Sequence, residues 1–313
     1  MSVILAGGTG FIGRTVAKVL NRNGYEVICI TRDTGHGIVP HQSPHYDSVI
    51  TWSRLVASGL PADCKAVINL CGENIMKLNR RWTPLYKEAV MSSRVDSTKK
   101  LRDLILDARV KPKAFITASG VGFYPPSATA AYDEYSAGGR HDFLAHVTVK
   151  WEEASRLPAS AGCRTVNLRT GAVLGRHGGV IKNLYWPFFF GLGGPVGRGN
   201  QPFPWIHIED IAHLYLYAME NDKCTGVYNA VSPHIITNAD FTRAFASALH
   251  RPACLPTPPF VLNALLGEER AKILTHGQIV HPKRLLDAGY KFIYPDINEA
   301  CCDVVAPPDA DDL

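Results

Sequence analysis

The sequence predicts an α/β protein with a doubly wound parallel sheet and a smaller, mainly helical part toward the C-terminus. Two observations support this fold class. Apolar residues 3–6 run directly into a glycine-rich turn and a helical pattern, and strand-like runs then alternate with helical stretches along most of the chain. Because parallel strands need a crossover between them, this alternation is typical of a Rossmann-type sheet.

The glycine turn has the sequence Gly7-Gly8-Thr9-Gly10-Phe11-Ile12-Gly13. A strand that enters such a turn and opens a helix brings backbone N–H groups and the positive end of the helix dipole to a dinucleotide pyrophosphate. Gly7 and Gly10 would permit the turn and the close approach of the phosphates, and Gly13 would let the helix pack on the strand. Residues 25–30 then read as the second strand. We therefore expect a dinucleotide site here.

The second strand ends at Thr31-Arg32, which Asp33 follows. An NAD site usually has a carboxylate near this point for the ribose 2′-hydroxyl, whereas a 2′-phosphate requires a cation. Thr31 offers a hydroxyl and Arg32 a guanidinium fork, so the pair favours NADP(H) over NAD(H). Asp33 either points away or pairs with the arginine, and a surface arginine in a loop is the alternative interpretation.

Further strand-like runs lie at residues 66–70, 114–119, 165–169, 205–208 and 226–230. In a doubly wound sheet, ligands bind beyond the carboxyl ends of the strands, so the residues that close each run are candidates for the site. Arg169 closes one of these runs. We expect its guanidinium to face the ligand crevice and to reach a phosphate or a carboxylate.

The composition of the 313 residues is that of an ordinary globular protein, with 46% hydrophobic and 19% charged residues. The net charge of +5 is spread along the chain, which argues against a nucleic-acid partner. His36, His41 and His45 lie in a loop expected at residues 33–47, and their spacing suits no metal site.

Eight cysteines show neither metal-ligand spacing nor a secreted disulfide framework, so we expect reduced thiols and a cytoplasmic protein. No apolar run is long enough to span a membrane, and the first strand leaves no room for a cleavable signal. The expected partner is a small molecule, with no membrane partner, and the chain is either a monomer or a homodimer.

The pattern of the chain predicts two domains. Residues 1–174 and 203–231 are expected to form the dinucleotide-binding domain. Residues 175–202 and 232–313 are expected to form a smaller domain that closes the crevice, because the pattern turns helical after residue 232. The aromatic block at 185–190 is either a substrate lid or the core packing of an inserted helix.

Several of these motifs resemble the extended, epimerase-like branch of the short-chain dehydrogenase/reductase superfamily. They are the glycine turn and residues 63–72, 117–120, 168–175 and 204–212. The chain is most similar to the NADP-binding epimerase-family subgroup that includes bacterial cell-division-inhibitor-like proteins. The resemblance implies cofactor contacts from the turn Leu70-Cys71-Gly72 and from Glu88 and Arg94, and it implies an active-site hydroxyl at Ser119.

Catalysis in this superfamily usually depends on a tyrosine and on a lysine four residues later, on one face of a helix. No tyrosine here has a lysine at that distance. His146 and Lys150 have the spacing on the helix expected to carry the pair, and Tyr124 offers a phenol close to Ser119. Tyr124 has an equally plausible structural role as a packed loop aromatic.

Two functions from different classes are therefore open. The first is an NADP-dependent oxidoreductase or epimerase that acts on a small polar metabolite, of which a sugar nucleotide is one type. Proton transfer would then fall to Tyr124, Ser119 or His146, with Lys150 in support. The second is an NADP(H)-binding sensor or regulatory protein that lacks the usual tyrosine and lysine. The fold alone does not distinguish them.

Overall fold

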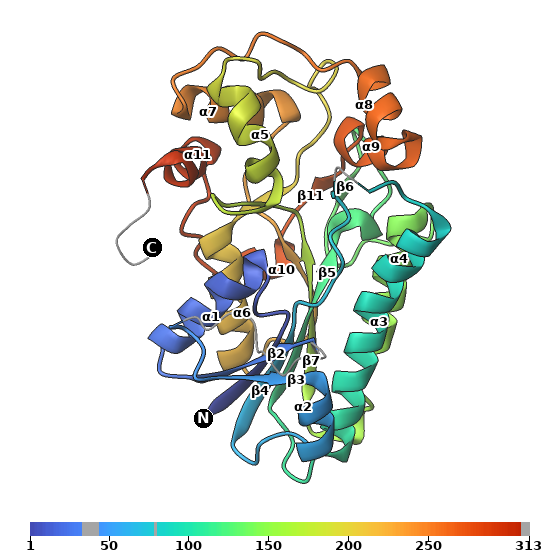
Figure 1. The fold of residues 1–313 in the computed structure, drawn as a ribbon, viewed down its shortest axis with the longest axis vertical. Helices are drawn as coiled ribbons and strands as arrows, with labels where there is room; N and C mark the ends of the chain where they lie inside the picture. The colour runs from blue at the N-terminus through green and yellow to red at the C-terminus, as the bar shows by residue number, and fades with distance from the viewer. Residues whose placement is uncertain (33–43, 78–79, 308–313) are drawn as a thin grey trace.

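The computed structural model describes residues 1–32, 44–77 and 80–307. Seven parallel strands form the main sheet at the lower end of the molecule in Figure 1. In chain order they are β1 (Ser2–Ala6), β2 (Glu26–Thr31), β3 (Ser48–Thr51), β4 (Cys64–Asn69), β5 (Ala114–Gly120), β7 (Arg164–Thr170) and β10 (Gly226–Ala230). Their spatial order is β10-β7-β5-β4-β1-β2-β3. The strand order reverses between β1 and β4, so the ligand crevice is expected beyond this point.

Helices cover both faces of the sheet (Figure 1). One face carries α1 (Phe11–Arg22) and α6 (Ile208–Glu220), and the other carries α2 (Trp52–Ser58), α3 (Pro84–Asp107) and α4 (Phe143–Ser155). Helix α3 begins with Pro84 in its first turn, and the Thr83 hydroxyl accepts a hydrogen bond from Tyr86 N. Successive strand residues are buried on alternate faces, which separates the core into two layers around the sheet.

The structure confirms the predicted fold class, a Rossmann-type α/β sheet with a helical C-terminal region. Two details differ from the expectation. The run at 205–208 forms β9 (Trp205–His207), which pairs with β8 (Ala172–Leu174) in a separate two-stranded sheet. The sheet instead gains β3, a short strand of half-buried residues that lacks the continuous apolar run of the others.

The C-terminal helices occupy the upper end of the molecule with the helix inserted after β8 (Figure 1). They are α5 (Gly179–Phe189), α7 (Asn238–Ala248), α8 (Pro259–Leu266), α9 (Glu268–Thr275) and α11 (Ile297–Val305), whereas α10 (Lys283–Asp287) lies beside the main sheet. A second core joins α5, α7 and α11 with β8 and β9. A short pair of strands, β6 (Ala131–Tyr132) and β11 (Ile279–Val280), connects this region to the sheet domain.

The division into two domains stays a proposal, and the packing of three residues crosses the proposed boundary. Leu285, Tyr290 and Phe292, which the division assigns to the smaller domain, pack on the core of the sheet domain. No helix of the described residues is long and apolar enough to cross a membrane.

Candidate functional site

The glycine turn packs directly against the end of β4. Gly7 has a φ of +80°, and a Cβ at this position would lie 2.6 Å from the Leu70 carbonyl carbon. A Cβ on Gly13 would lie 2.3 Å from Gly7 O, so helix α1 can approach the turn only with glycine there. Leu70 N donates a hydrogen bond to Ala6 O at 2.8 Å. The structure thus brings the turn and the predicted segment Leu70-Cys71-Gly72 together.

The first turn of α1 has unused backbone donors. Gly10 is the N-cap and provides no side-chain hydrogen bond to the helix. A Cβ on Gly10 would meet one described atom within 4 Å, Gly7 O at 3.2 Å, so the space beside Gly10 is largely open. Free N–H groups, an open approach and the helix dipole fit a pyrophosphate.

Tyr46 stabilises the glycine turn, although the sequence did not predict this contact. Its hydroxyl donates a hydrogen bond to Gly8 O at 2.8 Å. Burial raises the pKa of this phenol to about 12, so it stays protonated and keeps its donor. Cys29 lies on the other side of Gly8, since a Cβ on Gly8 would lie 2.6 Å from the thiol sulfur. Tyr46 lies 38 residues from Gly8 in the sequence, and no motif links the two positions.

Phe11 connects the turn to the upper part of the molecule. Its ring lies against Gly178, where a Cβ would be 2.3 Å from the Phe11 Cδ2 atom, and against Gly175 at 2.9 Å from Cζ. Both glycines belong to the segment that joins β8 to α5. Phe11 was expected to contact the cofactor, and the structure gives its side chain a packing role.

Arg32 is exposed directly after β2, at the carboxyl edge of the sheet. Its charge reaches the end of β4: the pKa of Glu73 is lowered, first by the hydrogen bond from Lys77 and in smaller part by Arg32. Thr31 lies beside Thr51 in the ladder between β2 and β3. Asp33, His36 and His41 lie outside the described residues, and no metal-binding cluster of His, Cys, Asp or Glu occurs within the described part.

Arg94 lies over the turn after β4, as the resemblance implied. A Cβ on Gly72 would be 3.0 Å from its guanidinium carbon, and the guanidinium stacks on Trp151 at 5.1 Å. Among the described residues it makes one hydrogen bond, from Nη1 to Val90 O at 3.0 Å. Burial lowers the pKa of Arg94 to about 10. A desolvated cation with free donors at this edge suits an anionic ligand.

Glu88 does not share this position. It is exposed on α3, whereas the residues of α3 that face the end of β4 are Arg94, Ser93 and Ser97. Six residues separate Glu88 from Arg94, so the two side chains lie about 120° apart around the helix axis. Glu88 therefore lies in solvent away from the end of β4, and its contact with the cofactor stays a prediction.

Arg169 does not face the crevice, contrary to expectation. Its side chain is 5% exposed and forms a two-pronged ion pair with Glu152, with Nε to Oε1 at 2.7 Å and Nη2 to Oε2 at 2.8 Å. The guanidinium also stacks on Phe123 at 3.3 Å from the ring centroid. The pKa of Arg169 is raised. Burial alone would lower it, but the hydrogen bonds that the guanidinium donates to Glu152 and the charge of that carboxylate have the larger effect. The sequence alone gave no sign that Glu152 on α4 faces inward.

Ser119 and Tyr124 belong to the same buried network. The Ser119 hydroxyl donates to Glu152 Oε1 at 2.8 Å. Tyr124 is fully buried, accepts a hydrogen bond from Arg169 Nη1 at 2.9 Å, and has Asn229 Oδ1 at 2.9 Å as an acceptor. Burial raises the pKa of Tyr124. Their hydrogen-bond partners among the described residues are protein groups, so both hydroxyls belong to the buried network. Proton transfer by either residue stays a prediction.

His146 and Lys150 lie on the wrong side of α4 for the catalytic role. The residues of α4 that face the end of β5 are Leu144, which a Cβ on Gly122 would meet at 3.5 Å, and Thr148, which a Cβ on Gly120 would meet at 3.4 Å. They are four residues apart, and His146 and Lys150 are displaced from them by about 200° around the helix. Lys150 forms a surface ion pair with Glu153 at 2.8 Å.

Arg270 on α9 is a second guanidinium of the crevice region that the sequence reasoning missed. It is 1% exposed, and its Nε and Nη2 atoms have no hydrogen-bond partner among the described residues. Its Nη1 donates to Arg80 O, in the segment that follows β4. Lys87 of α3 pairs with Glu269 beside it. Helix α9 therefore closes over the segment that borders the crevice.

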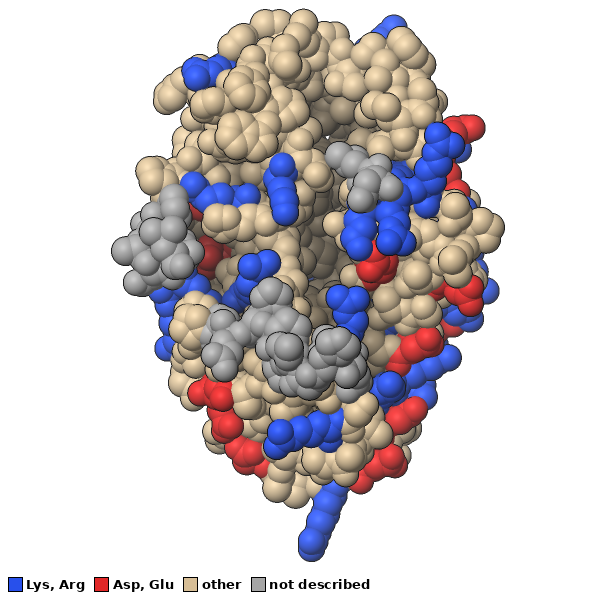
Figure 2. Space-filling model, in the orientation of Figure 1, with Lys and Arg blue, Asp and Glu red and all other residues tan. Residues whose placement is uncertain are grey.

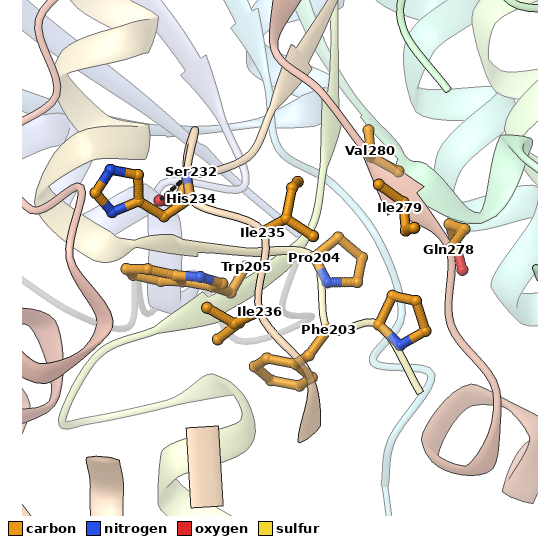
Figure 3. A pocket seen from close by; sticks show the side chains of 11 residues that line it. Phe203, Pro204, Trp205, Ser232, His234, Ile235, Ile236, Gln278, Ile279 and Val280 are labelled. Atoms are coloured by element: carbon orange, nitrogen blue, oxygen red, sulfur yellow. Dashed lines mark hydrogen bonds between the residues drawn. The ribbon is translucent and has the colours of Figure 1, made fainter. Parts of the chain in front are cut away.

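Figure 2 shows a hollow between the sheet domain and the C-terminal helices, with Lys and Arg side chains along its sides. A different and very small cavity lies among residues 202–205, 232–236 and 278–280 (Figure 3). Its volume is about 10 Å³, which is the room for one water molecule. A groove of about 810 Å³ lies at the amino ends of β7 and β10, away from the glycine turn.

The aromatic block divides between core and surface. Phe188 is buried in the second core, whereas Trp186 and Phe190 are 60% and 67% exposed. The core-packing interpretation therefore holds for Phe188.

Comparisons with known proteins agree with this geometry. Residues 3–230 match the NAD dependent epimerase/dehydratase family, and residues 257–304 match a domain of unknown function. The crystal structure of human epimerase family protein SDR39U1 with NADPH is 43% identical, with a TM-score of 0.90, and the match covers 97% of this chain and 99% of that chain. The SDR39U1 protein of Bos taurus is 44% identical over 98% of this chain and all of its own length. The YfhF protein of Bacillus subtilis is 33% identical over 98% of both chains.

Proposed function

Because this chain belongs to the NAD dependent epimerase/dehydratase family, we propose that it binds NADP(H) at the edge formed by the glycine turn, Arg32 and the end of β4. The observation that carries the proposal is the juxtaposition at this edge of an uncapped helix N-terminus and the exposed Arg32. The NADPH in the related human structure supports the choice of cofactor.

The donors at this edge fit the cofactor. Backbone N–H groups at Gly10 to Gly13 would hold the pyrophosphate, Arg32 would hold the 2′-phosphate, and Leu70-Cys71-Gly72 would border the cofactor as it crosses the sheet. The nicotinamide, when bound, supplies hydride-transfer capacity. Arg94 would direct positive charge at the cofactor or at a neighbouring anion.

We further propose that the protein acts as an NADP(H)-responsive binding protein and not through the superfamily's tyrosine and lysine. Leu144 and Thr148 stand where α4 faces the end of β5, and neither can exchange a proton near neutral pH. Tyr124 and Ser119 have their hydroxyls engaged in the buried network. This arrangement supports the sensor or regulatory alternative.

One observation favours a second candidate, an NADP-dependent oxidoreductase or epimerase for a small polar metabolite. Arg94 and Arg270 have donors that the described residues do not use, and both adjoin the segment after β4. Their charge would suit a metabolite with a phosphate or carboxylate group, which includes sugar nucleotides. The proton would then have to come from water or from the substrate itself.

Cofactor titration separates these proposals from their alternatives. NADPH should bind about 30- to 1000-fold more tightly than NADH, because the 2′-phosphate gains charge-assisted hydrogen bonds. Arg32→Ala should weaken NADPH binding by a similar factor and leave NADH binding unchanged, and Arg109→Ala, exposed between α3 and β5, is the matched control. Equal affinities for the two cofactors would exclude the role of Arg32.

Turnover distinguishes the two functions. NADPH oxidation is followed by absorbance with NADPH in excess over the protein and with a panel of carbonyl compounds and sugar nucleotides. Under the regulatory proposal, NADPH raises the melting temperature and no panel member is reduced. Sustained turnover would establish the enzyme candidate instead. We propose a cytoplasmic location because all eight cysteines are free thiols, as a reducing compartment would keep them.

A further inference from the structure

A group of large apolar side chains protrudes from the C-terminal lobe, at the end remote from the sheet. We call this group the aromatic tip. It consists of Trp186, Phe190, Leu192, Leu255 and Phe260, whose side chains are between 51% and 72% exposed. Helix α8 adds to it, because Leu266 is the one fully buried residue of its eight. Exposed apolar patches of this kind mark interaction surfaces.

The members of the tip are neighbours in space although they come from two segments. Trp186 stacks on Phe190 with ring centroids 5.9 Å apart. The segment after α5 then runs along the segment before α8, because Leu255 N donates to Gly193 O at 3.2 Å. A Cβ on Gly197 would lie 3.3 Å from Pro259, so the contact continues to the start of α8. The tip is therefore one surface.

The charge around the tip is mainly positive. Lys182, Arg198 and Arg251 are exposed in residues 176–208 and 241–267, which contain no aspartate or glutamate. Acidic residues adjoin these segments: Asp240 pairs with Arg243, and Glu268 and Glu269 follow the end of α8. Arg251 is fixed to the tip by its stacking on Phe189, 5.1 Å from the ring centroid. Figure 2 shows the same asymmetry, since the upper end of that face carries Lys and Arg but no acidic side chain.

We propose that the aromatic tip docks on an anionic lipid surface. Tryptophan and phenylalanine favour the interface of a bilayer, and nearby Lys and Arg side chains are attracted to anionic headgroups. A fluid interface accepts protruding side chains without a shaped partner. An acidic protein partner would instead need a pocket for each of these rings. The proposed docking is peripheral, because only the side chains of the tip would enter the headgroup region.

Vesicle sedimentation tests the docking. The full chain should bind vesicles of phosphatidylcholine with added phosphatidylserine and should bind phosphatidylcholine alone much less. The double variant Trp186→Ala, Phe190→Ala should bind the anionic vesicles at least about tenfold more weakly. Leu85→Ala is the matched control, because Leu85 is 77% exposed but lies on α3, away from the tip. This variant should bind the vesicles as the wild type does. NADPH affinity, which should not change in either variant, reports separately on the fold and on the cofactor proposal.

Two measurements identify the occupant. Tryptophan emission should shift to shorter wavelength with anionic vesicles, and Trp186→Phe should abolish the shift while binding persists. Unchanged vesicle binding by the double variant would overturn the proposal. A dimer in sedimentation velocity that the double variant dissociates, without vesicle binding, would assign the tip to a second copy. Binding of polyglutamate in place of vesicles would assign it to an acidic protein.

Discussion

The ion pair between Glu152 and Arg169 offers the sharpest test of the role of the buried network. Glu152 is 9% exposed and Arg169 is 4% exposed, and two hydrogen bonds of 2.7 and 2.8 Å join them. Glu152→Gln removes the negative charge and leaves the guanidinium buried without a counter-charge. Breaking a buried pair in this way costs about 3–5 kcal/mol. For a protein of this size the melting temperature should fall by about 5–8 °C.

The neighbouring residue provides the control. Glu153 pairs at the surface with Lys150 and Arg140, so Glu153→Gln should leave the melting temperature nearly unchanged. Unfolding is followed by fluorescence on heating and by urea titration. NADPH affinity is measured well below the transition, where it should stay at the wild-type value.

Two results would contradict this reasoning. If Glu152→Gln were no less stable than Glu153→Gln, the pair would not stabilise the fold. If Glu152→Gln kept its stability but lost a demonstrated turnover, the network of Ser119, Glu152 and Tyr124 would be catalytic. The double variant Glu152→Met, Arg169→Met should be more stable than Glu152→Gln, because it leaves no unpaired charge.

Three further predictions concern the site and the C-terminal helix. Gly10→Val should remain folded and lose NADPH binding, whereas Gly13→Val should lose secondary structure as well, because its Cβ would lie 2.3 Å from Gly7 O; circular dichroism with cofactor titration checks both. His146→Phe and Lys150→Ala should each change NADPH affinity less than twofold in the same titration, since both side chains lie away from the end of β5, and a tenfold loss in either would return it to the site. The hydrogen bond from His207 lowers the pKa of Asp303, so its ionised form stabilises the fold above about pH 4 and this contribution is lost as the pH falls further. Asp303→Asn should therefore show a smaller fall in melting temperature between about pH 4 and 3 than the wild type, and an equal fall would rule out this coupling.

The sequence predicted the sheet and the glycine turn because each of these features is local. A buried strand, a turn that only glycine can make and the first turn of α1 follow one another in thirteen residues. The cofactor contact expected of Arg94 came from family resemblance and not from its spacing, and it stays a prediction. The position of α3 beside the turn then places its guanidinium over Gly72.

The positions of the catalytic candidates depend on packing that the sequence could not reveal. Four-residue spacing defines a helix face but not the direction in which that face points. His146 and Lys150 satisfy the spacing, and so do Leu144 and Thr148; the packing of α4 on β5 turns the second pair toward the end of β5. The burial of Arg169 likewise depends on Glu152, seventeen residues earlier.

The fit of Phe11 between Gly175 and Gly178 has a mechanical consequence. Phe11 is the first residue of α1, whose N-terminus we propose holds the pyrophosphate, and the two glycines lie in the connection to α5. The Phe11 ring packs directly on backbone atoms, because neither glycine has a side chain that could rotate aside when the ring moves. We therefore expect a shift of the first turn of α1 to displace the start of α5 as well.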